Sequence, residues 1–176
     1  MHLPDFLIDR YKEWKKDTFD KNSRLYKKTS VEPQKPKAMI ISCCDSRVNE
    51  TSIFNGEIGD FFIHRNIANI VPTYNSANDH YNTLSSIEYA VCVLKVPHLI
   101  VMGHSNCGGI KYGYEVFCEN NKIENLVYLN EWIKNLSLVY KDLNKNTFDK
   151  NNIKFLEMKS VINSISNLQE YPFIKD

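Results

Sequence analysis

The chain has 176 residues, of which 43% are hydrophobic and 24% are charged, which is typical of one globular domain. Its 22 basic and 21 acidic residues give a net charge of +1, which excludes the strongly basic field of most nucleic-acid-binding proteins. No apolar run approaches the ~20 residues of a membrane span, and the first ten residues lack the order of a signal peptide. We therefore expect a single cytoplasmic domain over residues 1–176, with neither nucleic acid nor membrane as a partner.

The N-terminal segment 5–28 predicts an amphipathic helix. Apolar residues, including Tyr11, Trp14 and Phe19, recur among many charged ones at a roughly helical spacing. We expect residues 1–32 to form a helical arm whose aromatic residues pack against another surface.

Three short apolar runs predict strands at 38–42, 60–65 and 98–103. The last run is apolar at successive positions, as in parallel strands that are covered on both faces. Residues 83–95 carry apolar side chains at helical spacing, and Pro97 ends this segment. A strand, a helix and a strand in this order predict an α/β fold with a central, mostly parallel sheet flanked by helices.

Other patterns define the helices of this fold. Ser85 and Glu88 have the spacing of a capping box at the start of the helix 83–95. Two later segments, 124–140 and 152–168, carry apolar residues at mixed spacings of three and four and also predict helices. The polar stretch 144–152 predicts a loop between them.

Two polar clusters follow two of the predicted strands, and they read Cys43-Cys44-Asp45-Ser46-Arg47 and His104-Ser105-Asn106-Cys107-Gly108-Gly109. The carboxyl ends of parallel strands are where α/β folds bind ligands. The His-x-x-Cys spacing allows His104 and Cys107 to reach one metal ion, and Cys43 can supply a third ligand from a neighbouring strand end. Thiolate and imidazole ligands favour Zn²⁺, and three protein ligands leave one tetrahedral position open, as in catalytic zinc sites.

Asp45 and Arg47 are the candidate catalytic residues beside this predicted zinc site. An ionised Asp45 accepts a hydrogen bond from a reacting hydroxyl group, and Arg47 holds the carboxylate in place and offsets its charge. Two simpler interpretations remain open. In the first interpretation, the three predicted ligands Cys43, His104 and Cys107 are ordinary core residues. In the second, Asp45 and Arg47 form an ordinary ion pair on the surface.

The ordered set of motifs resembles the β-class carbonic anhydrases. The family pattern Cys-x-Asp-Ser-Arg, followed about 60 residues later by His-x-x-Cys-Gly-Gly, falls on the residues named above. Further similarity to the family lies at 34–37, 59–62, 65–69 and 86–91, so the resemblance is strong from 33 to 111 and weaker in the flanks.

The resemblance implies reversible hydration of carbon dioxide to bicarbonate and a proton, by attack of zinc-bound hydroxide on CO2. Members with a non-catalytic bicarbonate pocket carry Trp and Gly at the positions of Ile40 and Ser42, so the resemblance points to the open type of active site. Two alternatives are a zinc-dependent hydrolase of carbonyl sulfide or carbon disulfide, and a catalytically impaired zinc-binding scaffold.

The resemblance also implies an assembly, because the family's active-site cleft lies at a subunit interface. We expect a homodimer or a larger homo-oligomer, with the N-terminal helix across a partner. The family has one more strand and a final helix after a segment like 171–174, whereas this chain stops at Asp176. We therefore expect the C-terminal region to be truncated relative to the family.

The remaining cysteines and histidines carry weaker signals. The sequence has five cysteines, two of them adjacent, which does not suit a disulfide framework. Cys44, Cys92 and Cys118 have no partner pattern, and we expect buried or incidental thiols. His64 and His80 are candidates for proton relay, although each is also consistent with an ordinary structural role.

Overall fold

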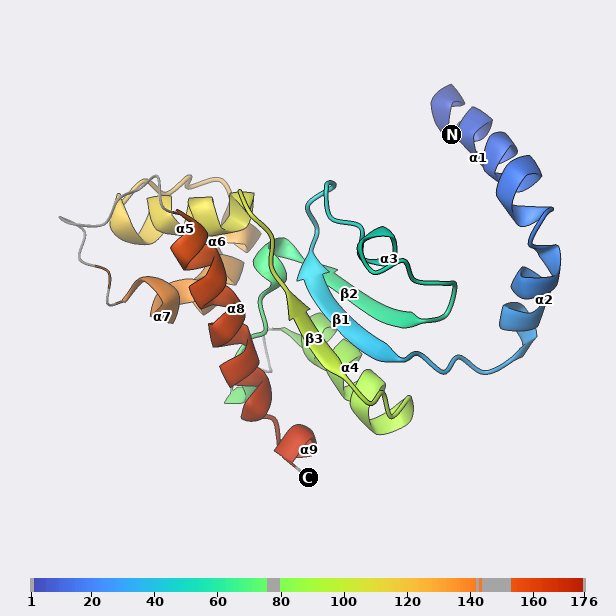
Figure 1. Ribbon diagram of the computed structural model, residues 1–176. Helices are drawn as coiled ribbons and strands as arrows, with labels where there is room; N and C mark the ends of the chain where they lie inside the picture. The colour runs from blue at the N-terminus through green and yellow to red at the C-terminus, as the bar shows by residue number, and fades with distance from the viewer. Residues whose placement is uncertain (1, 76–79, 142, 144–152, 176) are drawn as a thin grey trace.

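The computed structural model describes residues 2–75, 80–141, 143 and 153–175, so the predicted loop 144–152 lies outside the described residues. Within these ranges, β1 (Ala38–Cys43), β2 (Phe61–Asn66) and β3 (Leu99–Met102) form one parallel sheet in the order β2-β1-β3 (Figure 1). All six residues of the central strand β1 are buried. The predicted α/β fold with a parallel sheet is therefore confirmed.

The register of the sheet brings the carboxyl ends of the strands together. Cys43 pairs with Asn66 of β2, and Ser42 pairs with Met102, the last residue of β3. The residues that follow β1 and β3 therefore emerge at the same edge of the sheet, as expected for parallel strands.

Helix α4 (Tyr81–Glu88) covers one face of the sheet and continues as a π-helical turn, Tyr89–Val93. Met39 and Ile41 of β1 share a buried cluster with Leu84 and Ile87 of this helix. The predicted capping box is wrong, because the helix begins at Tyr81 and Ser85 lies inside it. The Ser85 hydroxyl donates to the Asn82 carbonyl at 3.2 Å, as serine does within a helix.

Four later helices contribute to a second buried cluster beside the sheet, namely α5 (Gly108–Cys118), α6 (Val127–Ile133), α7 (Ser137–Tyr140) and α8 (Ile153–Gln169). The last helix, α9 (Pro172–Lys175), packs against the first cluster through Phe173 and Ile174. The structure confirms the predicted helix 152–168 as α8, but it divides the predicted helix 124–140 into α6, the 3₁₀ turn Lys134–Leu136 and α7. Among the described residues, no helix is both long and apolar enough to cross a membrane.

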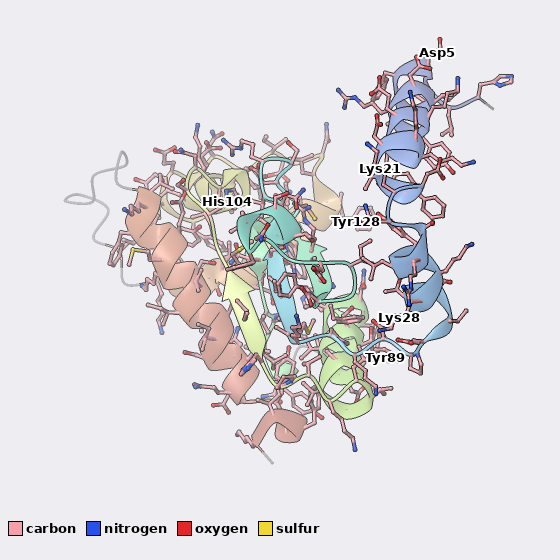
Figure 2. The ribbon with its side chains drawn as sticks, turned by 45° about the vertical axis from the view of Figure 1, so that its right-hand side comes forward. Asp5, Lys21, Lys28, Tyr89, His104 and Tyr128 are labelled. Carbon is pink, nitrogen blue, oxygen red and sulfur yellow. The ribbon has the colours of Figure 1, made fainter. Side chains whose placement is uncertain are left out.

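The N-terminal arm extends away from the sheet, and Figure 2 shows Asp5, Lys21 and Lys28 along it. The expected continuous helix is divided into α1 (Asp5–Trp14), the π-helical turn Lys15–Phe19 and α2 (Ser23–Val31), none of which contains a buried residue. The ring of Trp14 contacts the rings of Tyr11, Phe19 and Tyr26 at centroid distances of 5.6–5.8 Å. Within one chain, the arm's aromatic residues therefore pack mainly on each other.

Candidate metal centre

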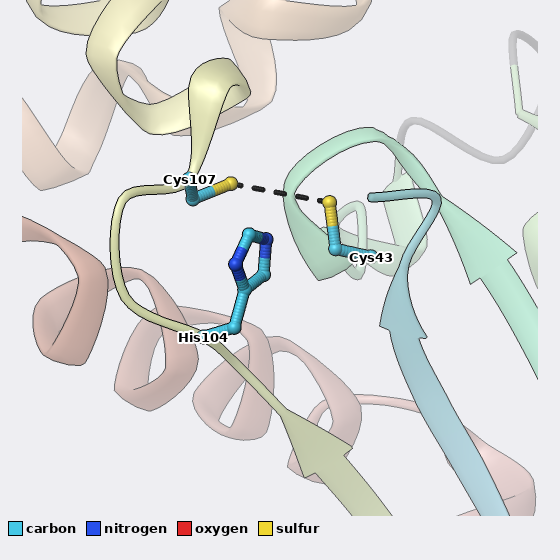
Figure 3. Close-up of side chains that lie close together, drawn as sticks. All are labelled: Cys43, His104 and Cys107. Atoms are coloured by element: carbon cyan, nitrogen blue, oxygen red, sulfur yellow. Dashed lines mark hydrogen bonds between the residues drawn. The ribbon is translucent and has the colours of Figure 1, made fainter. Parts of the chain in front are cut away.

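Three elements place Cys43, His104 and Cys107 around one point (Figure 3). Cys43 is the last residue of β1, His104 follows β3, and Cys107 is the N-cap residue of α5. Between the last two, Asn106 takes a left-handed conformation with φ of 55°, which asparagine tolerates well. The sulfur and ring nitrogen atoms of the three residues all lie within 4.8 Å of one another, so the structure brings the predicted ligand set together.

The geometry of the cluster fits a tetrahedral zinc ion. The two sulfurs are 3.9 Å apart, close to the ~3.8 Å that two Zn–S bonds of about 2.3 Å span at a tetrahedral angle. His104 Nδ1 lies 3.0 Å from the Ser105 carbonyl oxygen, which makes Nδ1 the donor. His104 Nε2 is buried and has no hydrogen-bond partner among the described residues. A ring whose other nitrogen bonds to a carbonyl is the usual arrangement of a metal-binding histidine.

The surroundings of the two sulfurs shift their pKa values in opposite directions. A hydrogen bond from the Cys107 thiol lowers the pKa of Cys43, and the backbone N–H groups of Asp45 and Ala68 act in the same direction. The same sharing of one proton raises the pKa of Cys107, whose sulfur accepts hydrogen bonds from the N–H groups of Gly109 and Ile110 at the start of α5. A divalent cation would displace the shared proton, since metal binding requires thiolates.

Asp45 and Arg47 form a two-point ion pair beside the cluster. Arg47 Nε donates to Asp45 Oδ1 at 2.8 Å, and Arg47 Nη2 donates to Oδ2 at 2.7 Å. These hydrogen bonds, with one from the Arg47 backbone N–H, hold the pKa of Asp45 well below its usual range. Arg47 Nη2 also donates to the Asn106 carbonyl at 3.1 Å, and Asp45 Oδ2 lies 3.9 Å from His104 Nε2. The carboxylate is therefore ionised, oriented and adjacent to the candidate metal position.

A cavity of about 320 Å³ opens beside the cluster, and its lining is Cys43, Cys44, Asp45, Ile67, Gly108, Gly109, Tyr112 and Leu129. Gly109 allows the start of α5 to approach Ala68 closely, because a Cβ atom at position 109 would lie 2.9 Å from the Ala68 Cβ. The cavity has room for a small molecule, and apolar side chains form much of its wall.

Three charged residues near the candidate metal centre were not predicted from the sequence to be part of the site. Glu157 of α8 accepts a hydrogen bond from the Cys107 N–H at 2.9 Å. Arg65 donates to the backbone carbonyls of Cys43 and Asp45, and the buried Glu50 lies beside it. In the sequence, Glu157 looks like an exposed residue of the predicted helix 152–168, Glu50 lies in no predicted element, and Arg65 is found only within a family motif.

The other candidate residues lie outside the ligand cluster. Cys44 and Cys92 are exposed and Cys118 is half-buried. His64 is buried and bonds to the Thr83 hydroxyl at 3.1 Å, and His80 bonds to Asn135 at 3.0 Å. Both histidines line a second cavity, of about 380 Å³, together with Cys44 and Arg65. A role for them in proton relay stays a prediction.

Comparison with known proteins identifies the family of the chain. A family model described as "Carbonic anhydrase" matches residues 38–176. Beta carbonic anhydrase 3 of Arabidopsis thaliana is 33% identical over 166 residues, which are 93% of this chain and 63% of the relative. A carbonic anhydrase of Synechocystis sp. is 30% identical over 171 residues, which are 96% of this chain and 60% of the relative. The chain thus spans a little under two thirds of the length of these curated relatives.

Solved structures agree with this assignment. The β-carbonic anhydrase CcaA superposes with a TM-score of 0.87 and 29% identity, over 97% of this chain and 75% of that one. A structure from a study of two tetrameric β-carbonic anhydrases of Sordaria macrospora gives a TM-score of 0.81 and 30% identity, over 97% of this chain and 83% of that one. On sequence, fold and the arrangement of the cysteine and histidine side chains, this chain belongs to the β-class carbonic anhydrase family.

Proposed function

We propose that this protein is a zinc-dependent carbonate dehydratase, a lyase that reversibly hydrates carbon dioxide to bicarbonate and a proton. The observation that carries the proposal is the position of the Asp45–Arg47 pair beside the candidate ligand cluster. The Oδ2 atom of Asp45 lies 3.9 Å from His104 Nε2. Cys43, His104 and Cys107 are the proposed zinc ligands. Zinc bound by them would act as a Lewis acid that lowers the pKa of a water molecule toward neutrality.

The roles of Asp45 and Arg47 follow from their hydrogen-bonding capacity. An ionised carboxylate only accepts hydrogen bonds, so Asp45 accepts the O–H of the attacking water and leaves an oxygen lone pair free for the carbon of CO2. Arg47 fixes both carboxylate oxygens and keeps the charge on Asp45. The catalytic contribution of both residues is therefore orientation and electrostatic support.

The cavity beside the cluster is the proposed substrate site. Ile67 and Leu129 supply apolar surface for CO2, which has no net charge, and Asp45 lines the same cavity. Bicarbonate, the anionic product, would be less well accommodated by apolar side chains and a carboxylate, which favours its release.

We also propose that the active site is of the open type. The pairing of Asp45 with Arg47 supports this assignment, because both oxygens of the carboxylate are engaged by the guanidinium. Ile40 and Ser42 stand at the two positions that distinguish the open type, and both are fully buried in β1.

Stopped-flow measurement of CO2 hydration on protein of known zinc content tests the proposed function. The rate should rise in proportion to bound zinc, disappear after chelation and return when zinc is restored. Hydrolysis of carbonyl sulfide without CO2 hydration would support the related hydrolase instead. A zinc-loaded protein that acts on neither substrate would be a binding scaffold, and the proposal would be wrong.

We propose that the chain forms a single domain, from which the arm of residues 1–32 extends. We also propose a homodimer as the minimal assembly, in which this arm lies across the partner subunit. The arm exposes Phe6, Leu7 and Tyr11 to solvent within one chain, and such apolar surface is commonly covered in an assembly. Light scattering at micromolar concentration should give twice the 20.5 kDa chain mass or a higher multiple. A monomer would contradict the proposal.

We further propose a cytoplasmic location. Cys44 and Cys92 are exposed thiols outside any disulfide, which suits a reducing compartment. Fractionation of cells that express the full-length protein, followed by detection in the soluble or exported fraction, tests this proposal.

A further inference from the structure

A polar chain links the buried Ser42 and Glu50 to the partly exposed Arg65, directly behind the candidate metal centre. We propose that Glu50 is a positioning residue, which acts through Arg65 to hold the turn at 43–47 in the conformation that keeps the Asp45 carboxylate on Arg47 and off the metal. This inference deepens the proposed function and rests on it for the catalytic consequence.

Arg65 connects strand β2 to the turn that follows β1. Its Nε atom donates to the Cys43 carbonyl at 2.9 Å, and its Nη2 atom donates to the Asp45 carbonyl at 2.7 Å. The guanidinium is a planar, rigid fork, so the two hydrogen bonds fix the relative orientation of two peptide groups. One peptide group belongs to Cys43, a proposed metal ligand, and the other belongs to Asp45, the proposed catalytic residue.

Glu50 fixes Arg65 in turn. It begins the short helix α3 (Glu50–Ile53), where Asn49 caps the helix by accepting from the Ser52 N–H at 3.1 Å. Glu50 is 3% exposed, its Oε1 atom lies 3.6 Å from Arg65 Nε, and it accepts a hydrogen bond from the Ser42 hydroxyl. Burial of a carboxylate is unfavourable without such partners, so this side chain has a defined place behind the turn.

The position of Asp45 makes the conformation of the turn important for chemistry. Its Oδ2 atom is bound to Arg47 Nη2 at 2.7 Å, yet it lies only 3.9 Å from His104 Nε2. A small rotation at Asp45 would therefore bring the carboxylate to the metal position, where it would compete with water for the fourth ligand site. Arg65 holds the backbone carbonyl of Asp45, and Glu50 is the carboxylate partner of Arg65 among the described residues. Loss of the Glu50 charge should therefore weaken the hold of Arg65 on the turn and free Asp45 to rotate.

Cobalt-substituted protein provides a test that is independent of turnover, since Co²⁺ accepts the same ligand types and its absorption spectrum reports its ligands. We would compare the native protein with Glu50→Gln and with the milder Ser42→Ala, which removes the hydrogen bond to Glu50 and leaves its charge. Asp60→Asn is the matched control, because Asp60 is paired with Lys37 at 2.6 Å at the other end of β1 and β2.

We expect all variants to keep about one metal per chain. Glu50→Gln should change the Co²⁺ spectrum as a carboxylate enters the ligand set and should slow CO2 hydration by about 10- to 100-fold, the cost of misplacing a catalytic group by about 1 Å. Ser42→Ala should show a smaller change of the same kind. Asp60→Asn should keep the native spectrum and rate, even if it lowers the melting temperature as much as Glu50→Gln does.

The double variant Glu50→Gln/Arg65→Lys tests whether Glu50 acts through Arg65. Residues that act as one unit have non-additive effects, so the double variant should have the spectrum of Arg65→Lys alone. Native spectra in both Glu50→Gln and Ser42→Ala, or full additivity in the double variant, would overturn the inference. If the native zinc protein fails to hydrate CO2, the proposed function is wrong, but the Co²⁺ spectra still decide the positioning role.

Discussion

The carboxylate of Glu157 accepts a hydrogen bond from the backbone N–H of Cys107 at 2.9 Å. This contact joins α8, far along the chain, to the first turn of α5 and to a proposed zinc ligand. Glu157 is 8% exposed, so the contact is largely shielded from water and Glu157 supports the ligand from behind.

Replacing Glu157 with Ala should weaken zinc binding by about 10- to 100-fold, the usual effect of removing a group that orients a metal ligand. The Cys107 N–H would lose its acceptor, and the start of α5 would be held less firmly. Glu157→Gln is the control, because its amide oxygen keeps an acceptor for the N–H. Zinc affinity measured by competition with a chromophoric chelator checks the prediction, and equal affinities for the Ala variant and the native protein would refute it.

Removal of the Cys107 thiol should abolish stable zinc binding. Cys107→Ala leaves one sulfur and one imidazole, too few ligands for a catalytic zinc site. Metal analysis after gel filtration should find less than about a tenth of the native zinc content, since metal binding depends on the complete set of deprotonated ligands. Cys92→Ala, which removes an exposed thiol elsewhere, should retain full zinc content. Undiminished zinc in Cys107→Ala would remove this residue from the ligand set.

Asp45→Asn should keep zinc and slow CO2 hydration by about 10²- to 10⁴-fold, the range for loss of a group that handles a proton in the reaction. The amide can donate a hydrogen bond where the mechanism requires an acceptor, and Arg47 loses its charged partner. Asp9→Asn, which alters an exposed ion pair with Lys12 on the arm, should retain the native rate. A normal rate in Asp45→Asn would exclude this carboxylate from catalysis.

His64 predicts a specific pH dependence of stability. Burial lowers the pKa of His64, so below the unfolded-state value of about 6.5 the unfolded chain binds more protons at this position than the folded one. The contribution of His64 to the free energy of unfolding is therefore present above about pH 6.5 and is lost as the pH falls toward the lower pKa of the folded state. The loss is at most about 1.4 kcal/mol per pH unit. Urea unfolding at pH 7.5 and 5.5 should show a smaller loss for His64→Gln than for native protein.

The exposed His98 offers a matched control for this measurement. Other groups also titrate between the two pH values, but their contributions cancel when the variants are compared with the native protein. His98→Gln should lose as much stability as the native protein on acidification. An equal loss for His64→Gln would mean that the buried imidazole does not contribute to the pH dependence.

The sequence by itself determined the strands and the chemistry at their ends. Strands of a parallel sheet favour short apolar runs, which is why 38–42, 60–65 and 98–103 were recognisable and correspond to β1, β2 and β3. Only β1 is buried along its whole length, and most residues of β2 and β3 are partly buried. Cys43, His104 and Cys107 were also recognisable, because each stands close to the end of a predicted strand and parallel strands end at one edge.

Local sequence patterns were less reliable for helix ends. Ser85 and Glu88 have the spacing of a capping box, yet the packing of Leu84 and Ile87 against β1 extends the helix back to Tyr81. Tertiary contacts thus overrode the local signal, because burial of several apolar side chains outweighs the ~1 kcal/mol of a helix cap.

Only the tertiary structure decided which buried polar residues support the centre. Glu50 and Glu157 carry no sequence signal, since a glutamate in a helix is usually exposed, and they become buried because Arg65 and the Cys107 N–H lie opposite them in the fold. Each partner is distant in sequence, and Glu157 is 50 residues from Cys107. A local motif indicates the types of ligand atom, but a hydrogen bond between remote segments exists only after the chain has folded. The residues that support the metal centre could therefore be identified only from the structure.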